Sequence, residues 1–165
     1  FAAAGIRFDA AFSGDGIRHR ETAARLLDAA GSGLQASSDP RWRELCFGGL
    51  EAVRARRFVR LMQAHVAADN PFFATLDALA EQDPLAESPA DVARRATEAL
   101  HDVAGAGSEV LVVTSGITIL TLLHGLGADL SHLTIGPENL SVSTVLRVDD
   151  GWRVDRAAMP DPVAV

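Results

Sequence analysis

Lysine and tyrosine are absent from this 165-residue chain, so all 15 basic side chains are arginines. The absence of lysine excludes a P-loop, which needs a lysine to contact phosphate, and a Schiff base between a lysine and a carbonyl compound. Cys46 is the only cysteine, which excludes an internal disulfide and any metal site built from several thiolates. A single thiol is compatible with a reducing compartment, and we expect a cytoplasmic protein that needs no metal or cofactor.

Long hydrophobic runs are also missing. The longest apolar stretch, residues 110–123, is interrupted by hydroxyl side chains and is too short to span a bilayer. The formal net charge of −7 disfavours nucleic acid as a general partner, because DNA and RNA are polyanions. With 48% hydrophobic and 22% charged residues, the composition is that of an ordinary folded protein, and the length fits one domain.

The hydrophobic pattern contains two strand–turn–helix units. The first predicts a strand over residues 6–13 and a helix over 15–30, and the second predicts a strand over 110–114 and a helix over 117–126. The other expected elements are a connection at 31–40, a short strand at 42–47, helices at 50–67 and 88–103, a short helix or irregular stretch at 72–87, and a hairpin of strands 140–148 and 152–157. This order predicts helices on both faces of a mostly parallel sheet with an antiparallel edge.

The turns after the two expected parallel strands are the best place for a ligand. In open α/β sheets, the carboxyl ends of strands meet helix N-termini, whose free amides attract anions. These turns contain residues 13–20, with Arg18, and residues 114–116, while Glu44 near the end of the next expected strand offers a proton donor. We expect a small anion site, most plausibly for phosphate; the alternative is that the small residues only form turns.

Four segments of the sequence match motifs that occur together in one protein family. The sequence FSGDGIRHRETA at residues 12–23 is similar to Y-S-S-D-x-x-R-A-x-x-T-A, and RELCFGGLE at 43–51 is similar to L-x-E-x-x-F-G-x-x-E-G. The sequence VLVVTSG at 110–116 resembles the V-L-V-V-S-H-G strand, and NLSVS at 139–143, followed by Gly151-Trp152, resembles the late N-x-S-V-S strand and its hairpin. By these motifs, the chain resembles the histidine phosphatase superfamily, the phosphoglycerate-mutase-like proteins.

The resemblance implies a three-layer α/β/α sandwich around a mostly parallel sheet with an antiparallel edge strand. It also implies that residues 1–165 form a single, N-terminally incomplete domain, because the family's first strand and most of its first helix have no counterpart here. Residues 1–5 read independently as the last turn of a helix that ends at Gly5. Residues 54–87 would be a helical insertion over the site.

The family's reaction is a phosphoryl transfer through a phosphohistidine. By the resemblance, Arg18 is a phosphate-binding residue, Glu44 is the catalytic acid that protonates the leaving oxygen, and Ser115 and Gly116 bind the phosphate. The ligand would be a small phosphorylated molecule, and a homodimer is possible.

Two departures leave three hypotheses open. The family's nucleophile sits in an R-H-G motif, which these residues do not contain, and Ser115 stands where the family has a second catalytic histidine. A neutral hydroxyl cannot replace an imidazolium charge. The chain is therefore a phosphatase of small phosphate esters whose nucleophile lies upstream, a non-catalytic phosphate-binding or scaffold domain, or an incomplete fragment; we expect the chain alone to be inactive.

The remaining histidines and arginines carry no ligand spacing. We expect His19 on a solvated helix face, with contact to the anion as the alternative. The basic run formed by Arg54, Arg56, Arg57 and Arg60 fits a solvated face, and binding of an acidic substrate tail is the alternative. Surface or core positions are expected for the other four histidines, which are His65, His101, His124 and His132.

Overall fold

The computed structural model describes residues 1–51, 55–131, 137–149 and 151–159. The chain divides into two compact units. The first comprises Phe1–Glu44 and Ala93–Val165, and the second comprises Leu45–Val92. Every residue of the predicted anion site belongs to the first unit.

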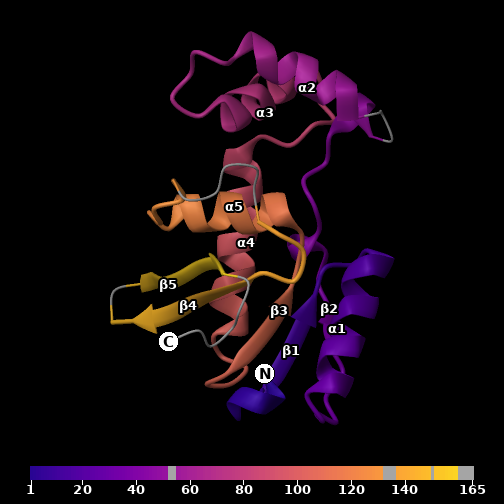
Figure 1. The fold of residues 1–165 in the computed structure, drawn as a ribbon, viewed down its shortest axis with the longest axis vertical. Helices are drawn as coiled ribbons and strands as arrows, with labels where there is room; N and C mark the ends of the chain where they lie inside the picture. Colours follow the sequence, from indigo (N-terminus) through magenta and orange to yellow (C-terminus); the bar gives the residue numbers. More distant parts are fainter. Residues whose placement is uncertain (52–54, 132–136, 150, 160–165) are drawn as a thin grey trace. The chain divides into compact units, whose positions relative to one another are not determined.

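A three-stranded parallel sheet organises the first unit. Strand β1 (Ala10–Ser13) lies between β2 (Ser37–Ser38) and β3 (Val110–Val113), so the strand order is β2-β1-β3 (Figure 1). In β1 and β3, Ala10 pairs with Val110 and Ser13 pairs with Val113. Because the two strands are parallel and in register, their carboxyl ends lie next to each other.

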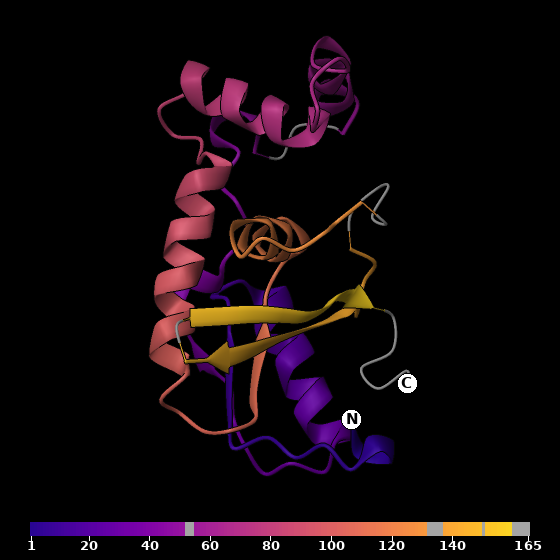
Figure 2. The same cartoon turned by 90° about the vertical axis from the view of Figure 1, so that its left-hand side faces the viewer.

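Helices cover both faces of this sheet, as the sequence predicts. Helix α1 (Ile17–Ala29) and helix α4 (Pro89–Val103) lie on opposite sides of β1 and β3 (Figure 2). Alternate strand residues pack into two separate hydrophobic clusters. Ala11, Leu111 and Val113 join Ala23 and Leu27 of α1. Phe12, Val110 and Val112 pack against Trp42 and four residues of α4, which are Ala96, Ala99, Leu100 and Val103. The period of two follows from the pleat of a strand that is covered on both faces.

The antiparallel strands form a hairpin sheet of their own. Helix α5 (Gly116–Gly125) follows β3, and strands β4 (Val142–Val148) and β5 (Gly151–Met159) then pair through residues that include Val148 and Gly151. Val145 and Trp152 of the hairpin pack against the α4 cluster. A mostly parallel sheet with helices on both faces and a separate antiparallel pair confirms the expected α/β sandwich.

Two expectations between residues 31 and 47 are wrong. The predicted connection contains β2, whose two residues pair with Phe12 and Ser13 of β1. The predicted strand at 42–47 is absent, because Pro40–Trp42 form a short 3₁₀ helix (η2) that is capped by Asp39. The Asp39 carboxylate accepts hydrogen bonds from the backbone and side chain of Arg41, which hold the pKa of Asp39 below its usual range. The indole of Trp42 is thereby turned into the core, where 1% of the residue is exposed.

The second unit is mainly helical. It contains the 3₁₀ helix η3 (Gly48–Leu50), α2 (Ala55–Ala64) and α3 (Pro71–Gln82), with the side chain of Asn70 capping α3. The Asp83 carboxylate accepts a 2.6 Å hydrogen bond from the amide of Gly49, and Gly48 has a φ of +57°. A β-carbon at Gly48 would collide with Asp83, so this tight turn requires glycine.

The chain begins with a 3₁₀ turn (η1, Ala2–Ala4) that ends at Gly5, whose left-handed φ of 69° is that of a helix stop.

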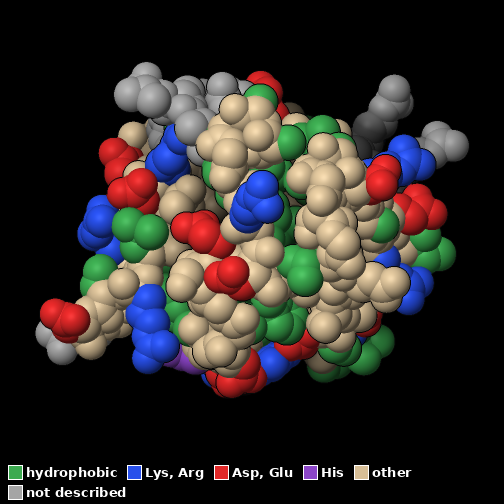
Figure 3. Space-filling model, turned by 90° about the horizontal axis from the view of Figure 1, so that it is seen from below, with side chains coloured by type: hydrophobic (Ala, Val, Ile, Leu, Met, Phe, Trp, Pro, Cys, Tyr) green, Lys and Arg blue, Asp and Glu red, His purple; other side chains and the backbone are tan. Residues whose placement is uncertain are grey.

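Acidic and basic side chains are interspersed on the face seen in Figure 3. In the described part of the chain, no helix combines the length and hydrophobicity needed to cross a membrane.

Candidate functional site

The candidate site lies where β1 and β3 lead into α1 and α5. Ser115 is the N-cap of α5, but its hydroxyl makes no capping bond to its own helix. The amide of Ile119 donates to the Ser115 carbonyl at 3.0 Å, which leaves the amides of Gly116, Ile117 and Thr118 without an acceptor inside the helix. These donors and the positive end of the helix dipole favour an anion beside Ser115.

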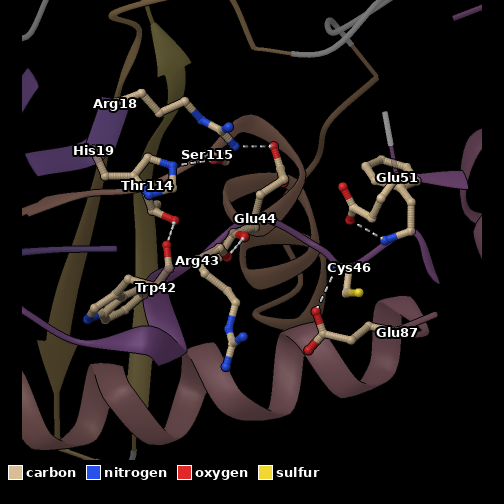
Figure 4. Close-up of polar contacts among 12 residues, drawn as sticks. Arg18, His19, Trp42, Arg43, Glu44, Cys46, Glu51, Glu87, Thr114 and Ser115 are labelled. Atoms are coloured by element: carbon tan, nitrogen blue, oxygen red, sulfur yellow. Dashed lines mark hydrogen bonds and ion pairs between the residues drawn. The ribbon is translucent and has the colours of Figure 1, made fainter. Parts of the chain in front are cut away.

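Three of the predicted residues converge at this helix start. Nη2 of Arg18 donates to Oγ of Ser115 at 3.0 Å and lies 3.8 Å from Oε2 of Glu44 (Figure 4). The Arg18 side chain is 68% exposed and that of Glu44 is 26% exposed. The structure therefore brings a cation, a hydroxyl and a carboxylate together from three segments of the chain, and the cation is open to solvent.

The backbone that carries Glu44 is fixed by three side chains whose contacts were not predicted from the sequence. The guanidinium of Arg95 on α4 donates to the carbonyls of Arg41, Arg43 and Glu44 at 2.6, 3.0 and 3.3 Å. From the other side, Thr118 donates to the Arg43 carbonyl at 2.7 Å and Thr114 donates to the Trp42 carbonyl at 2.6 Å. Thr118 in the first turn of α5 and Thr114 just before that helix were the available signal for this anchoring.

The expectation for His19 is wrong, because its side chain is buried. His19 is only 4% exposed, and its Nε2 lies 2.5 Å from Oγ of Ser115. Within the described residues, Nδ1 of the same ring has no hydrogen-bond partner. The ring occupies space that side chains at Gly14 and Gly16 would otherwise fill. The two glycines that precede His19 were thus the signal in the sequence for a buried imidazole.

Burial lowers the pKa of His19 below the ordinary value of a histidine, and the positive charge of Arg18 acts in the same direction. The negative charge of Asp15 opposes this shift less strongly. The imidazole is therefore neutral at neutral pH. Arg18 carries the positive charge next to Ser115.

Acid is expected to destabilise the fold through His19. Since the folded-state pKa lies below that of the unfolded chain, the unfolded state binds more protons as the pH falls through about 6.5, where an exposed histidine titrates. The free energy of unfolding should therefore fall on acidification through this window. Urea unfolding at a series of pH values measures it, and His19→Gln should flatten the dependence. His124→Gln, which removes an exposed imidazole from the last turn of α5, is the matched control.

Gly116 adjoins this cluster, whereas the other predicted candidates lie near helix ends, belong to the second unit or cannot be assessed. Gly116 is the first residue of α5, directly after Ser115. His101 and His124 are exposed near the ends of their helices, and Arg60 is exposed on α2. Arg54 and His132 lie outside the described residues, and the side chains of Arg56 and Arg57 are also outside them. In the described ranges, no three His, Cys, Asp or Glu side chains gather as a metal ion would require.

Known structures share this fold. Phosphoglycerate mutase from Bacillus anthracis superposes with a TM-score of 0.81 at 25% identity, and the match covers 96% of this chain and 76% of that one. Mycobacterial glucosyl-3-phosphoglycerate phosphatase matches in a complex with inorganic phosphate (TM-score 0.64, 21% identity, 95% and 82% coverage). Its structure with VO3 matches as well (TM-score 0.62, 18% identity, 93% and 78% coverage).

Two comparisons of the sequence were made with known proteins. None of the curated proteins matches this chain. The model of the histidine phosphatase superfamily (branch 1), in contrast, matches residues 2–159. That range includes both strand–turn–helix units, the segment that carries Glu44 and the hairpin. The chain therefore belongs to the histidine phosphatase superfamily.

Proposed function

We propose that this chain binds the phosphoryl group of small phosphate monoesters at the start of α5. The observation that carries the proposal is the convergence of Arg18, Ser115 and Glu44 beside the amides of that helix. An arginine and a row of backbone amides supply the donors that a phosphoryl group needs for its oxygens. In this proposal Glu44, whose Oε2 lies 3.8 Å from Nη2 of Arg18, protonates the leaving oxygen.

Two observations on other proteins support the ligand class. The mycobacterial glucosyl-3-phosphoglycerate phosphatase, which has the same fold, was solved with inorganic phosphate and with VO3. Both ligands are small oxyanions that present several oxygens around one central atom. In this chain, the Arg18 side chain is mostly exposed, so such a group can approach it from solvent.

Turnover requires a nucleophile that attacks phosphorus, and we propose that residues 1–165 do not provide it. They contain no R-H-G motif, and Ser115 replaces the histidine of the S-H-G motif. A non-catalytic phosphate-binding domain is therefore the second candidate function, and the Ser115 substitution favours it. In the first candidate function, a phosphatase of small phosphate esters, the same site would work together with an R-H-G segment that this sequence does not contain.

Calorimetry and a chromogenic assay test the proposal together. Titration of the purified 165-residue chain with inorganic phosphate should show saturable binding, while 4-nitrophenyl phosphate should be hydrolysed no faster than in buffer. Absence of phosphate binding would overturn the proposal. Turnover that is lost in Glu44→Ala and kept in Glu21→Ala, a control for an exposed carboxylate on α1, would show that catalysis needs no R-H-G motif.

A further inference from the structure

The contact between His19 and Ser115 has no role in the function proposed above. A hydroxyl group has one proton to donate and two lone pairs that accept. Arg18 donates into one lone pair of Ser115 Oγ at 3.0 Å, and Nε2 of His19 lies 2.5 Å from the same oxygen. The protonation of Nε2 therefore decides where the single hydroxyl proton of Ser115 points.

Two arrangements of this contact are possible. When Nε2 is unprotonated, it accepts the Ser115 proton, and the hydroxyl has nothing to donate to a ligand. When Nε2 carries a proton, which one neutral tautomer allows and the imidazolium requires, it donates into the second lone pair, and the Ser115 O–H must point away from both His19 and Arg18. An anion needs donors, so only the second arrangement offers it the Ser115 proton.

We propose that His19 is a positioning residue that directs the Ser115 hydroxyl toward a bound oxyanion and couples the binding of that anion to proton uptake. The inference rests on the proposed phosphate site. The burial of His19 against Gly14 and Gly16 and its contact with Ser115 hold the ring in one place.

The charges around the ring give the sign of this coupling. Arg18 and Asp15 lie on or next to α1, and Glu44 approaches Arg18 from the segment after η2. Burial and the positive charge of Arg18 lower the pKa of His19, so the ring is neutral when no anion is bound. A dianion beside Ser115 offsets the charge of Arg18 and stabilises an imidazolium. Binding therefore raises the pKa of His19, and by linkage the affinity for a dianion increases as the pH falls.

Histidine NMR of the intact chain, with sulfate as the probe, tests the coupling directly. Sulfate stays a dianion across the neutral and mildly acidic range, so its own titration does not contribute. The ring resonances of His19 should titrate at a higher pH in saturating sulfate than without it. The same His19 titration with and without bound sulfate would overturn the inference.

Variants provide the second measurement. His19→Gln keeps an amide donor of similar reach but cannot take up a proton, so it should bind sulfate about tenfold more weakly than wild type at low pH and nearly as well at high pH. A loss of the same size at every pH would indicate a merely structural role and overturn the coupling. His124→Gln is the control for removal of an exposed imidazole.

The route through Ser115 is tested by a double-mutant cycle. Ser115→Ala should weaken sulfate binding, and addition of His19→Gln to it should cost less affinity than the same change costs in wild type. Additive losses would show that His19 does not act through Ser115. If Arg18→Ala removes binding while both His19 and Ser115 variants bind like wild type, the inference fails and the proposed function stands. If wild type binds neither sulfate nor phosphate, the proposed function fails as well.

Discussion

Replacement of Arg18 by alanine is expected to weaken the binding of inorganic phosphate by about 10- to 100-fold. A hydrogen bond to a charged partner contributes about 1.5–3 kcal/mol, and 1.4 kcal/mol corresponds to a factor of about ten in affinity. Arg18 is the cation that donates to Ser115, and its side chain is mostly exposed, so a ligand can reach it. Calorimetric titration of wild type and Arg18→Ala with phosphate or vanadate measures the loss.

Arg20→Ala is the matched control for this variant. Arg20 is exposed on the same helix, two positions along, so its removal changes the net charge equally. We expect a change of less than about threefold, because a solvent-exposed charge outside the site acts only through a screened field. Equal losses of phosphate affinity in the two variants would show that Arg18 acts only through its long-range charge and does not contact the ligand.

Gly14→Ala is expected to destabilise the fold by about 1–3 kcal/mol, the usual range for overpacking of a filled interior. Gly14 is buried, and a β-carbon there would collide with Nδ1 of His19 and lie 2.5 Å from the Trp42 carbonyl oxygen. That carbonyl is backbone, and it accepts the hydrogen bond from Thr114. Neither neighbour can move without a change in the contacts that assemble the site.

Chemical denaturation of the variant gives its free energy of unfolding, and histidine NMR reports on the His19–Ser115 contact. Gly33→Ala is the control, because a β-carbon at Gly33 meets nothing within 4 Å. Gly33→Ala should change the free energy of unfolding by less than about 0.5 kcal/mol and should leave the His19 signals unshifted. If Gly14→Ala proved as stable as Gly33→Ala, the ring of His19 would not be packed against Gly14 as the structure has it.

The sequence predicted those elements whose signals are local. Helix α4 begins at Pro89 and ends at Val103, as expected from Ser88 as a cap and Pro89 at the first helical position. Strand β3 was equally clear from its continuous apolar run. Strand β2 was not, because Ser37 and Ser38 form a strand only through pairing with β1. The sequence WRELCF at 42–47 suggested a short strand, but the buried Trp42 belongs to a 3₁₀ turn.

The candidate site was predicted in part for the same reason. Arg18, Glu44 and Ser115 could be placed by motif, and the structure brings them together. The role of His19 could not be predicted from its neighbours in sequence, since a position between two arginines suggests a solvent-exposed helix face. Its burial depends on Gly14 and Gly16, which clear space for the ring, and on Ser115, which is 96 positions away.

Mapping of inorganic phosphate by backbone amide NMR tests the central claim most directly. In a titration of the isotope-labelled 165-residue chain, we predict that the largest shifts fall on the amides of Gly116, Ile117 and Thr118 at the start of α5. The same titration of Arg18→Ala should lose these shifts at equal phosphate concentrations. Shifts that cluster on another part of the chain, or that persist unchanged without Arg18, would contradict a phosphate site at this helix start.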